Sequence, residues 1–542
     1  MASGKPSPPP IKKSRTRQLT LEESMAGATG STSRPRETPT CDTPPLFSDS
    51  ESEQPSSQDD SQFLNDDLHS QTSATLSYPA SPQGTPPPAP QGVLLSQISF
   101  GPSCNPILPP LSSSPSHTVT FHTRLRPGHA PRPHPDKFCD VWDSNHVRSP
   151  CSSQSLYPVK TNTGEKVLMS RWTLIRASLS KPIANSYDLE EAIMEYNSRQ
   201  AGKWSFGALH AYFSEAACLL ANGFFCTFPR RNAFHRGAEF STYPSVNFNT
   251  LFSGRRTTSI HPVRVAKLKC LFHYFTCVTS KPPTGVLTFT RQVCKDPPHW
   301  DKCSEKLSKL HLSSEGTIED DGHGMLQVDF ANKRVGGGVL GSGAVQEEIR
   351  FLICPELILS RLFTEELQEN ESLVITGAER FSSYSGYGST FEWAGSHTDS
   401  TARDSWGRRD MTLVAMDAIV VRNSASQFKP GLIRRELLKA YCSFTSTAST
   451  PCGRLRAVAT GNWGCGAFGG DKRLKALLQW LAASAAGRDV VYFTFGDKGL
   501  RQDLHVLQEE LVGLGATSVA DVWRVLLTYH RQQSPQPPLY KF

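Results

Sequence analysis

The chain has 542 residues, of which 37% are hydrophobic and 20% are charged, with a formal net charge of +7. This length accommodates roughly two to four domains, and so small a net charge does not by itself indicate a polyanionic partner. The sequence contains no run of 18 apolar residues, and its first residues lack the apolar core of a secretory signal. We therefore expect no membrane-spanning helix and no membrane partner.

Residues 1–118 differ in composition from the rest of the chain. They contain 20 of the 40 prolines and 23 serines, but none of the nine tryptophans. Such a segment cannot bury enough apolar surface to offset the entropy of ordering its backbone, which predicts a disordered regulatory tail. Its basic cluster, Lys12, Lys13, Arg15 and Arg17, fits a nuclear import signal and an ordinary solvated patch equally well. We expect the protein in the nucleus and the cytoplasm.

The next segment, residues 119–235, has a helical pattern in its second half. Apolar residues recur there at three- and four-residue steps, around Ser170–Ile175, Leu189–Ile193 and Glu215–Phe228. We interpret residues 119–235 as a helical accessory region.

Beyond residue 265, strand-like and helix-like patterns alternate. Strands are expected at Met325–Phe330, Leu373–Thr376, Leu413–Val421, Ala457–Thr460 and Val490–Phe495. Helices are expected at Gln346–Leu367, Ile433–Phe444, Lys472–Ala486, Leu500–Leu514 and Val519–Arg531. This alternation predicts an α/β fold whose parallel or mixed sheet is covered on both faces, with ligands bound beyond the carboxyl ends of the strands.

The 14 cysteines are scattered, and none of them forms a C-x-x-C pair. Cys270, His273 and Cys277 come nearest to a set of metal ligands, but no second pair follows at zinc-finger spacing. We therefore expect no metal site, and reduced thiols in an intracellular protein.

One loop between a predicted strand and a predicted helix is rich in glycine, with five glycines in the eight residues from Gly336 to Gly343. Such a backbone can approach a ligand closely and donate N–H groups to phosphate oxygens, which predicts a diphosphate cradle. The G-x-G-x-x-G from Gly336 to Gly341 fits a dinucleotide-binding site poorly, because Glu356, the acidic candidate, falls inside the following helix. A phosphate-loop NTPase is also a poor fit, because no Lys-Ser/Thr pair follows the glycines.

Two adjacent carboxylates, Glu347 and Glu348, open the helix after this loop. By themselves they fit the ordinary preference for acidic residues in a helix's first turn. Beside a cradle for an anionic ligand, however, their charge opposes binding, and two neighbouring carboxyl groups hinder each other's ionisation. One of them can then donate a proton to a departing hydroxyl and later take one from water. Asp329, at the end of the preceding strand, is expected to face the same cleft and position the pair.

Several motifs, in order from about Trp142 to the end of the chain, resemble those of the poly(ADP-ribose) glycohydrolases. The defining motif is Gly336–Gly338, followed after seven residues by Gln346–Glu348. The supporting motifs are Gly316–Glu319, Val328–Asn332, Tyr384–Tyr387, Thr460–Asp471 and Phe493–Asp497. The resemblance implies a macrodomain-like three-layer α/β/α sandwich over residues 236–542, preceded by the helical accessory region.

The resemblance also implies the activity of a glycosidase. It would hydrolyse the ribose–ribose O-glycosidic bonds of poly(ADP-ribose) chains on modified proteins, without a metal or another cofactor, and so reverse this modification in the DNA damage response. By this resemblance Glu348 is the acid/base, Glu347 holds the ribose hydroxyls and Asp329 supports the pair. Substrate-binding residues are implied at Ile318, Glu319, Asn332, Gly337, Gly338, Gln346, Tyr387, Asn462, Trp463, Gly464, Cys465, Gly466, Ala467 and Phe495.

Other interpretations stay open at the level of sequence. Tyr387 fits a closing lid or a solvated loop, and Phe495 fits a ligand contact or the core. A non-catalytic reader of poly(ADP-ribose) is the alternative function, although such a reader has no need of paired acids beside an anionic ligand. We expect a monomer without direct sequence-specific binding to nucleic acid. About a dozen residues join Phe206 to Leu219, where the family has a longer helical segment.

Overall fold

The structure is a computed structural model of the chain. It describes residues 93–98, 118–122, 156–160, 164–184, 186–197, 216–228, 231, 238, 240–252, 261–281, 286–404, 407–445, 455–513 and 518–531. The predicted basic cluster, most of the predicted tail and the short connection at residues 207–215 lie outside these residues.

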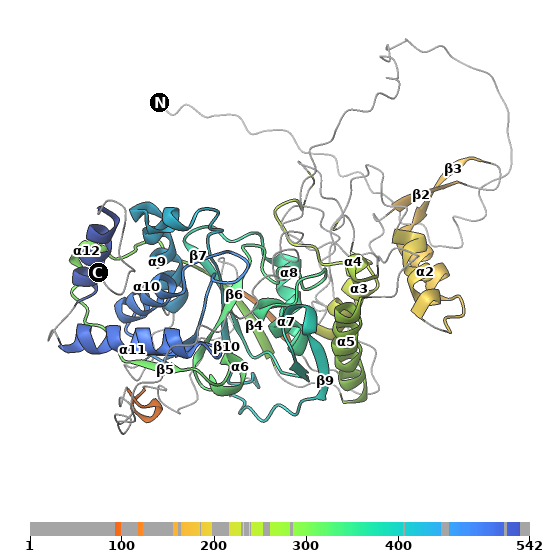
Figure 1. Cartoon of the computed structure of the whole chain (residues 1–542). Coiled ribbons are helices and arrows are strands. Elements are labelled where there is room, and N and C mark those ends of the chain that lie inside the picture. The colour runs from red at the N-terminus through yellow and green to blue at the C-terminus, as the bar shows by residue number, and fades with distance from the viewer. Residues whose placement is uncertain are drawn as a thin grey trace, which may run out of the picture. The chain divides into compact units, whose positions relative to one another are not determined.

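A mixed eight-stranded sheet forms the centre of the described part of the chain (Figure 1). Its strands, in spatial order, are β1 (Thr118–His122), β4 (Val286–Val293), β7 (Glu371–Thr376), β10 (Thr412–Asp417), β6 (Leu326–Ala331), β11 (Val458–Thr460), β12 (Val490–Phe493) and β5 (Leu310–Ser313). Strands β10, β6, β11, β12 and β5 run parallel to one another, whereas β1, β4 and β7 pair antiparallel. The sheet therefore presents several parallel carboxyl ends at one edge.

Helices cover both faces of this sheet, as strand β10 shows by its alternation. Leu413 and Ala415 belong to one apolar core, whereas Val414 and Met416 belong to another. The first core includes residues of α5 (Pro262–Ser280), α7 (Gln346–Ile353) and α8 (Ser360–Phe363). The second includes residues of α9 (Pro430–Phe444), α10 (Lys472–Ala485), α11 (Lys498–Gly513) and α12 (Val519–Arg531). The predicted three-layer α/β/α sandwich is confirmed.

The N-terminal part of the described chain contains the predicted helices, as α1 (Arg171–Leu179), α2 (Ser186–Asn197) and α3 (Ala216–Phe224), followed by the short α4 (Asn249–Phe252). Three strands that the sequence did not predict precede or adjoin these helices. These are β1 and the hairpin of β2 (Leu156–Lys160) and β3 (Lys166–Ser170). The sequence of β1, Thr-Val-Thr-Phe-His, alternates β-branched or aromatic residues in a strand pattern, and β1 pairs with β4 at the edge of the main sheet.

A short piece of the predicted disordered tail is docked on the folded domain, which corrects that prediction for residues 93–98. Ile98 is buried in an apolar cluster with Ile318 and Met325. The Lys309 ammonium donates a hydrogen bond to the carbonyl of Gln97 at 2.8 Å. The tail's average composition conceals this local apolar segment, which can anchor a few residues even where the surroundings are polar.

The predicted helix over residues 346–367 is interrupted. Helix α7 ends at Ile353, because Pro355 lacks the N–H that a continuing helix needs, and a 3-10 helix (Pro355–Leu359) and α8 follow. The remaining predicted strands and helices beyond residue 265 are present with small shifts at their ends. The apolar patterns did not predict β4 and β5, the short helix α6 (Ile318–Asp321) or the hairpin of β8 (Ser382–Ser385) and β9 (Glu392–Ser396).

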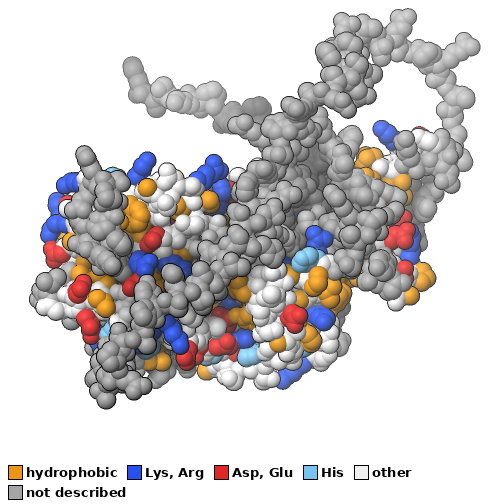
Figure 2. All heavy atoms as spheres, viewed as in Figure 1, with side chains coloured by type: hydrophobic (Ala, Val, Ile, Leu, Met, Phe, Trp, Pro, Cys, Tyr) orange, Lys and Arg blue, Asp and Glu red, His pale blue; other side chains and the backbone are white. Residues whose placement is uncertain are grey.

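Acidic, basic and apolar side chains are interspersed on the face seen in Figure 2. Among the residues that the structure describes, no helix is both long and apolar enough to cross a membrane.

Candidate active site

The predicted site residues gather at the carboxyl ends of four parallel strands. Helix α6 follows β5, the glycine-rich loop and α7 follow β6, a second glycine-rich loop follows β11, and Phe495 follows β12. We call residues 336–343 the first loop and residues 461–470 the second loop. Because the strands are parallel, their carboxyl ends lie at the same side of the sheet. Segments up to 180 residues apart in sequence therefore meet there.

The two glutamates at the start of α7 are buried and held by backbone N–H groups of the first loop and its neighbours. Glu347 accepts hydrogen bonds from the N–H groups of Asn332 at 2.9 Å and Gly336 at 2.5 Å. Glu348 accepts from Gly338 at 2.8 Å and from Val345 at 2.9 Å. These donors fix both carboxyl groups before any substrate binds. The N–H groups of Gly336 and Gly338 therefore serve the glutamates, and the diphosphate cradle stays a prediction for the rest of the loop.

Glycine is required in this loop by the closeness of the carboxyl groups. A Cβ atom on Gly337 would lie 2.5 Å from an oxygen of each glutamate, and the φ of Gly337 is +43°. A Cβ atom on Gly338 would lie 2.9 Å from the backbone nitrogen of Gly343. Both residues therefore contribute by leaving room for the carboxylates and for the tight turn of the loop.

Three carboxyl groups share this buried site, and the pKa values of Glu347 and Asp329 are perturbed. Burial raises the pKa of Glu347 well above its usual range, and the charges of Asp329 and Glu348 raise it further. Burial likewise raises the pKa of Asp329 to about 8, opposed by the nearby Arg350 guanidinium. A proton is therefore retained within this group of acids near neutral pH, as the sequence predicts for adjacent carboxylates.

Asp329 lies near the two glutamates but does not position them by a direct hydrogen bond. It is fully buried on β6, and neither carboxyl oxygen has a hydrogen-bond partner within the described part of the chain. Its effect on the pair is therefore electrostatic, which corrects the expected supporting contact.

Gln346 and Asn332 hold the backbone around this acid group. The side chain of Gln346 accepts from the N–H of Phe330 at 2.8 Å and donates to the carbonyl of Val328 at 3.2 Å, so it links α7 to β6 on both sides of Asp329. The side-chain oxygen of Asn332 accepts from the N–H of Arg334 at 2.9 Å. Both side chains thus have structural partners, in addition to the ribose contacts that the resemblance implies for them.

Two buried cations that the sequence analysis missed hold the first loop from the opposite side. The Lys267 ammonium, on α5, donates to the carbonyls of Gly338, Val339, Gly341 and Gly343. The Arg361 guanidinium, on α8, donates to Val335 and Gly337, each at 3.0 Å. Burial lowers the pKa of Lys267 to about 8, and the charge of Glu348 opposes this shift. Lys267 lies on the apolar side of its helix, between Val263 and Leu271, and this position was the available signal.

Tyr387 lies over the start of α7. Its hydroxyl accepts a hydrogen bond from the N–H of Gln346 at 3.3 Å, while 57% of the residue is exposed. The flanking Gly386 and Gly388 both have positive φ angles, of 73° and 60°. The Tyr387 side chain thus makes one hydrogen bond to α7 and lies between two glycines, and its interpretation as a closing lid stays a prediction.

The α6 residues that were predicted to hold the adenine take different positions. The Ile318 side chain is 1% exposed and packs in the core, so only its backbone can meet a ligand. Glu319 is partly exposed and accepts a hydrogen bond from the hydroxyl of Tyr384 at 2.5 Å. Ile318 can therefore meet a ligand only through its backbone, whereas Glu319 lies at the surface of the site.

The second loop is anchored by its tryptophan. The Trp463 side chain is fully buried and donates to the carbonyl of Met416 at 3.0 Å, and the Lys475 ammonium lies 4.2 Å from the centre of its ring. The side chain of Trp463 is therefore a structural anchor, and only the backbone of this residue can meet a ligand. Asn462, before it, accepts a hydrogen bond from the hydroxyl of Tyr492 at 3.1 Å.

Beyond this anchor, the second loop offers backbone to the solvent. Gly466 and Ala467 are exposed, and a Cβ atom on Gly466 would meet nothing within 4 Å. Gly464 has a φ of 71°, and Cys465 is partly buried with its thiol directed to the carbonyl of Trp463. This surface suits the diphosphate that the resemblance places here.

Phe495 follows the last residues of β12 and is not part of the core. Its residue is 42% exposed, and its φ of +51° is unusual for a bulky side chain. A Cβ atom on Gly461 would lie 2.5 Å from the Phe495 ring, so the ring packs closely on the first residue of the second loop. The exposed ring beside this loop is available to a ligand, and the ligand contact stays a prediction.

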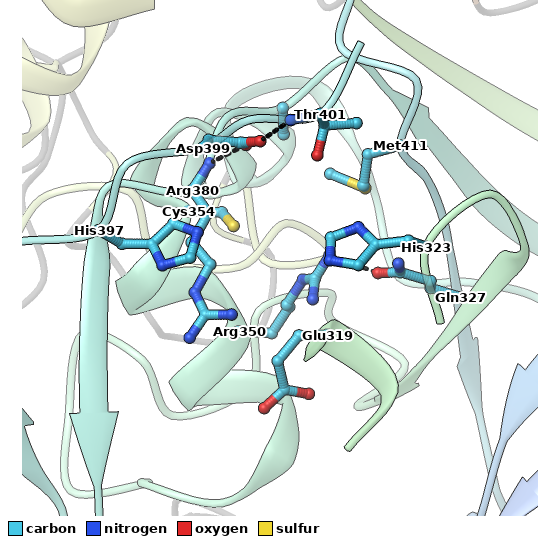
Figure 3. A pocket seen from close by; sticks show the side chains of 11 residues that line it. Glu319, His323, Gln327, Arg350, Cys354, Arg380, His397, Asp399, Thr401 and Met411 are labelled. Atoms are coloured by element: carbon cyan, nitrogen blue, oxygen red, sulfur yellow. Dashed lines mark hydrogen bonds between the residues drawn. The ribbon is translucent and has the colours of Figure 1, made fainter. Parts of the chain in front are cut away.

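A cavity lies next to the acid group but does not include it. Figure 3 shows Arg350 between His323 and Gln327 on one side and Arg380 and His397 on the other. Arg350 donates to the side-chain oxygen of Gln327 at 2.6 Å, and its charge acts on Asp329. The cavity shares only Glu319 with the predicted site residues.

Cys270, His273 and Cys277, which we do not expect to bind a metal, lie on α5. Cys270 is buried, and the sulfur of Cys277 lies 3.4 Å from a ring nitrogen of His273. No group of three metal-binding side chains occurs among the described residues.

The fold and the site together define a macrodomain with a buried acid pair at the edge where its parallel strands end. Residues 297–502 match a family model described as "Poly (ADP-ribose) glycohydrolase (PARG), Macro domain fold". Residues 207–291 match the model of the same family's helical domain. The predicted domain boundary at residue 235 lies inside this second match, so α4 and α5 go with the helical part.

Named relatives agree with these matches. Poly(ADP-ribose) glycohydrolase 1 of Arabidopsis thaliana is 36% identical, over 58% of this chain and 68% of its own length. The probable poly(ADP-ribose) glycohydrolase 2 of the same plant is 34% identical over the same shares. Poly(ADP-ribose) glycohydrolase 1 of Caenorhabditis elegans is 39% identical, over 45% of this chain and 33% of its own. The chain belongs to the poly(ADP-ribose) glycohydrolase family.

Proposed function

We propose that the chain is a glycosidase that hydrolyses the ribose–ribose O-glycosidic bonds of poly(ADP-ribose) and releases ADP-ribose. One observation carries this proposal. Glu348 is buried at the start of α7, with its two carboxyl oxygens held by different N–H groups, beside two further acids. A carboxyl group fixed in this way can deliver a proton to one defined atom of a bound substrate.

The proposed reaction uses Glu348 twice. Its carboxyl group protonates the departing 2′-hydroxyl oxygen as the bond to the anomeric carbon breaks and positive charge develops on the ribose. The resulting carboxylate then takes a proton from a water molecule, whose oxygen bonds to the anomeric carbon. The neighbouring Glu347 accepts from the N–H groups of Asn332 and Gly336. The remaining lone pairs of its carboxyl oxygens bind the ribose hydroxyls.

The remaining site residues hold the rest of the ADP-ribose unit. The exposed backbone of Gly466 and Ala467 receives the diphosphate, Glu319 and the Phe495 ring hold the adenosine, and Tyr387 closes over the ribose. The exposed or partly exposed positions of these residues, all at one edge of the sheet, support their roles.

A chain-release assay tests the function. The full chain is incubated with labelled poly(ADP-ribose) in the presence of a metal chelator, alongside Glu348→Gln and the control Glu356→Gln. Glu356 is a second buried glutamate, which accepts from the N–H of Glu379 at 3.3 Å and lies outside the site. We expect the first substitution to slow release by about 1,000-fold or more and the control to keep it.

The outcomes separate the hydrolase from the reader. Release by the wild type and by Glu356→Gln, but not by Glu348→Gln, supports the proposed reaction. Polymer binding without release by the wild type contradicts it and favours the non-catalytic reader.

We also propose that the protein acts as a monomer in the nucleus and the cytoplasm, reversing poly(ADP-ribosyl)ation after DNA damage, without sequence-specific binding to nucleic acid. The basic cluster that begins at Lys12 supports the nuclear location, and the substrate class supports the role after DNA damage. Microscopy of the tagged full-length chain before and after DNA damage tests the location.

A further inference from the structure

Lys267 lies where the helical part of the chain meets the catalytic loop. It is fully buried on α5, within the helical-domain match, while its partners belong to the first loop, within the macrodomain match. Its ammonium lies 3.1 Å from the carbonyl oxygen of Gly338 and 2.9 Å from that of Gly341, and it also contacts Val339 and Gly343. An ammonium has three N–H donors, so these four carbonyls share them.

The same loop presents N–H groups to the proposed acid. The N–H of Gly338 donates a hydrogen bond to Glu348 at 2.8 Å. The carbonyl of the same residue accepts a hydrogen bond from the Lys267 ammonium. Gly343 accepts from Lys267 too, and a Cβ atom on Gly343 would lie 2.7 Å from the same oxygen of Glu348. The loop is therefore clamped between one buried cation and one buried carboxyl group.

The electrostatics of this arrangement require the cation. Four carbonyl dipoles that converge on one point repel one another unless a positive charge lies between them. Without the ammonium, the buried carbonyls would have to rotate toward other partners. The Gly338 carbonyl shares its planar peptide unit with the N–H of Val339, so its rotation changes the backbone angles of Gly338, the residue whose own N–H donates to Glu348.

We propose that Lys267 is a positioning residue for Glu348, through which the helical part of the chain sets the geometry of the catalytic loop. The proposal rests on the proposed hydrolase function. Lys267 makes no contact with the substrate in this role; it acts through Gly338.

The test compares Lys267→Met and Lys267→Arg in the full chain. Single-turnover release of ADP-ribose gives the chemical step, calorimetry with free ADP-ribose gives the affinity, and thermal unfolding gives the stability. We expect Lys267→Met to slow the chemical step by about 100-fold, as for a misplaced catalytic group, while the affinity changes by less than about threefold. Lys267→Arg keeps the charge, but the planar guanidinium cannot replace a single ammonium on which four carbonyls converge. We expect this variant to slow the chemical step by about tenfold.

Arg488→Met is the matched control. Arg488 is also buried and holds the carbonyls of Phe444 and Arg456, but it precedes β12, at the end of the sheet opposite the site. We expect this variant to lose stability while the folded protein keeps the wild-type rate. If Lys267→Met slows the step no more than Arg488→Met does, the proposal is wrong.

Two further outcomes are distinguishable. If Lys267→Met does not fold, Lys267→Arg decides, and a wild-type rate in that variant overturns the proposal. If the wild-type chain itself releases no ADP-ribose, the proposed function fails, and the assignment of Lys267 to catalysis fails with it.

Discussion

The two glycine-rich loops at the active edge have similar compositions but different surroundings. Each follows a parallel strand and leads into a helix, from β6 to α7 and from β11 to α10. In the first loop, buried cations hold the carbonyls and N–H groups point to the carboxyl groups of Glu347 and Glu348. In the second, a buried tryptophan holds the loop and its tip is exposed.

The difference lies in the residues that start the following helix. Helix α7 begins with two acids that take the N–H groups of the loop before it. Helix α10 follows Asp471, which caps its own first turn by accepting from the N–H of Leu474 at 2.8 Å. A glycine-rich loop therefore becomes a support for catalytic groups or a surface for an anion according to its neighbours, and glycine content alone does not distinguish the two.

Adding one methyl group to each loop tests this comparison most directly. Gly337→Ala places a Cβ atom 2.5 Å from both carboxyl groups at a positive φ, and should lower the turnover by about 100-fold or more. Gly466→Ala enters open space, and should leave the turnover at saturating polymer unchanged and weaken binding by less than about tenfold. Steady-state kinetics of both variants measures this. Equal losses of turnover would contradict the division of roles between the loops.

A smaller effect is expected where the second loop meets the adenosine site. Phe495→Ala removes an exposed ring that packs beside Gly461, and should weaken the binding of ADP-ribose by about tenfold while the saturated turnover stays within about threefold. Calorimetry with ADP-ribose, together with steady-state kinetics, provides the measurement. Unchanged affinity would place Phe495 outside the ligand site.

The smallest effect concerns the contribution of the buried acid Asp329 to the stability of the protein, and how this contribution depends on pH. Burial raises the pKa of Asp329 in the folded state to about 8, whereas the unfolded chain has the ordinary value near 3.9. As the pH rises from 4 to 8, the unfolded state loses this proton first, so this residue's contribution to the free energy of unfolding falls. Asp329→Asn does not titrate, and its melting temperature relative to the wild type should therefore rise across that interval, by about 3–6 °C.

Thermal unfolding at several pH values checks this prediction. Glu356→Gln serves as a second probe, because burial raises the pKa of Glu356 to about 7. A difference between Asp329→Asn and the wild type that does not depend on pH would contradict the raised pKa of Asp329.

The sequence predicted the sheet and the acid pair because both leave local signals. Apolar periodicity marks the buried strands and helices after residue 265, and the glycines beside Glu347 mark a loop with a function. The break after Ile353 was also readable, since Pro355 is incompatible with a continuous helix.

Other features depend on contacts between distant segments. Lys267 lies about 70 residues from the carbonyls that it binds, and the Trp463 side chain is buried against Met416, which lies 47 residues away in sequence. The pairing of β1 with β4 joins segments about 170 residues apart. Local patterns carry no information about such partners, so the structure was needed to find them.

Helix α7 has only eight residues, and every residue from Glu347 to Ile353 is buried. Backbone amides in such a buried segment exchange with solvent only when the surrounding core opens, so we expect the proposed acid to lie in a slowly exchanging element. The acid therefore cannot follow a moving substrate. The adjustments of each catalytic cycle fall to exposed segments such as Gly386–Gly388, and the speed of their opening and closing sets an upper limit on how fast successive units of a polymer can be removed.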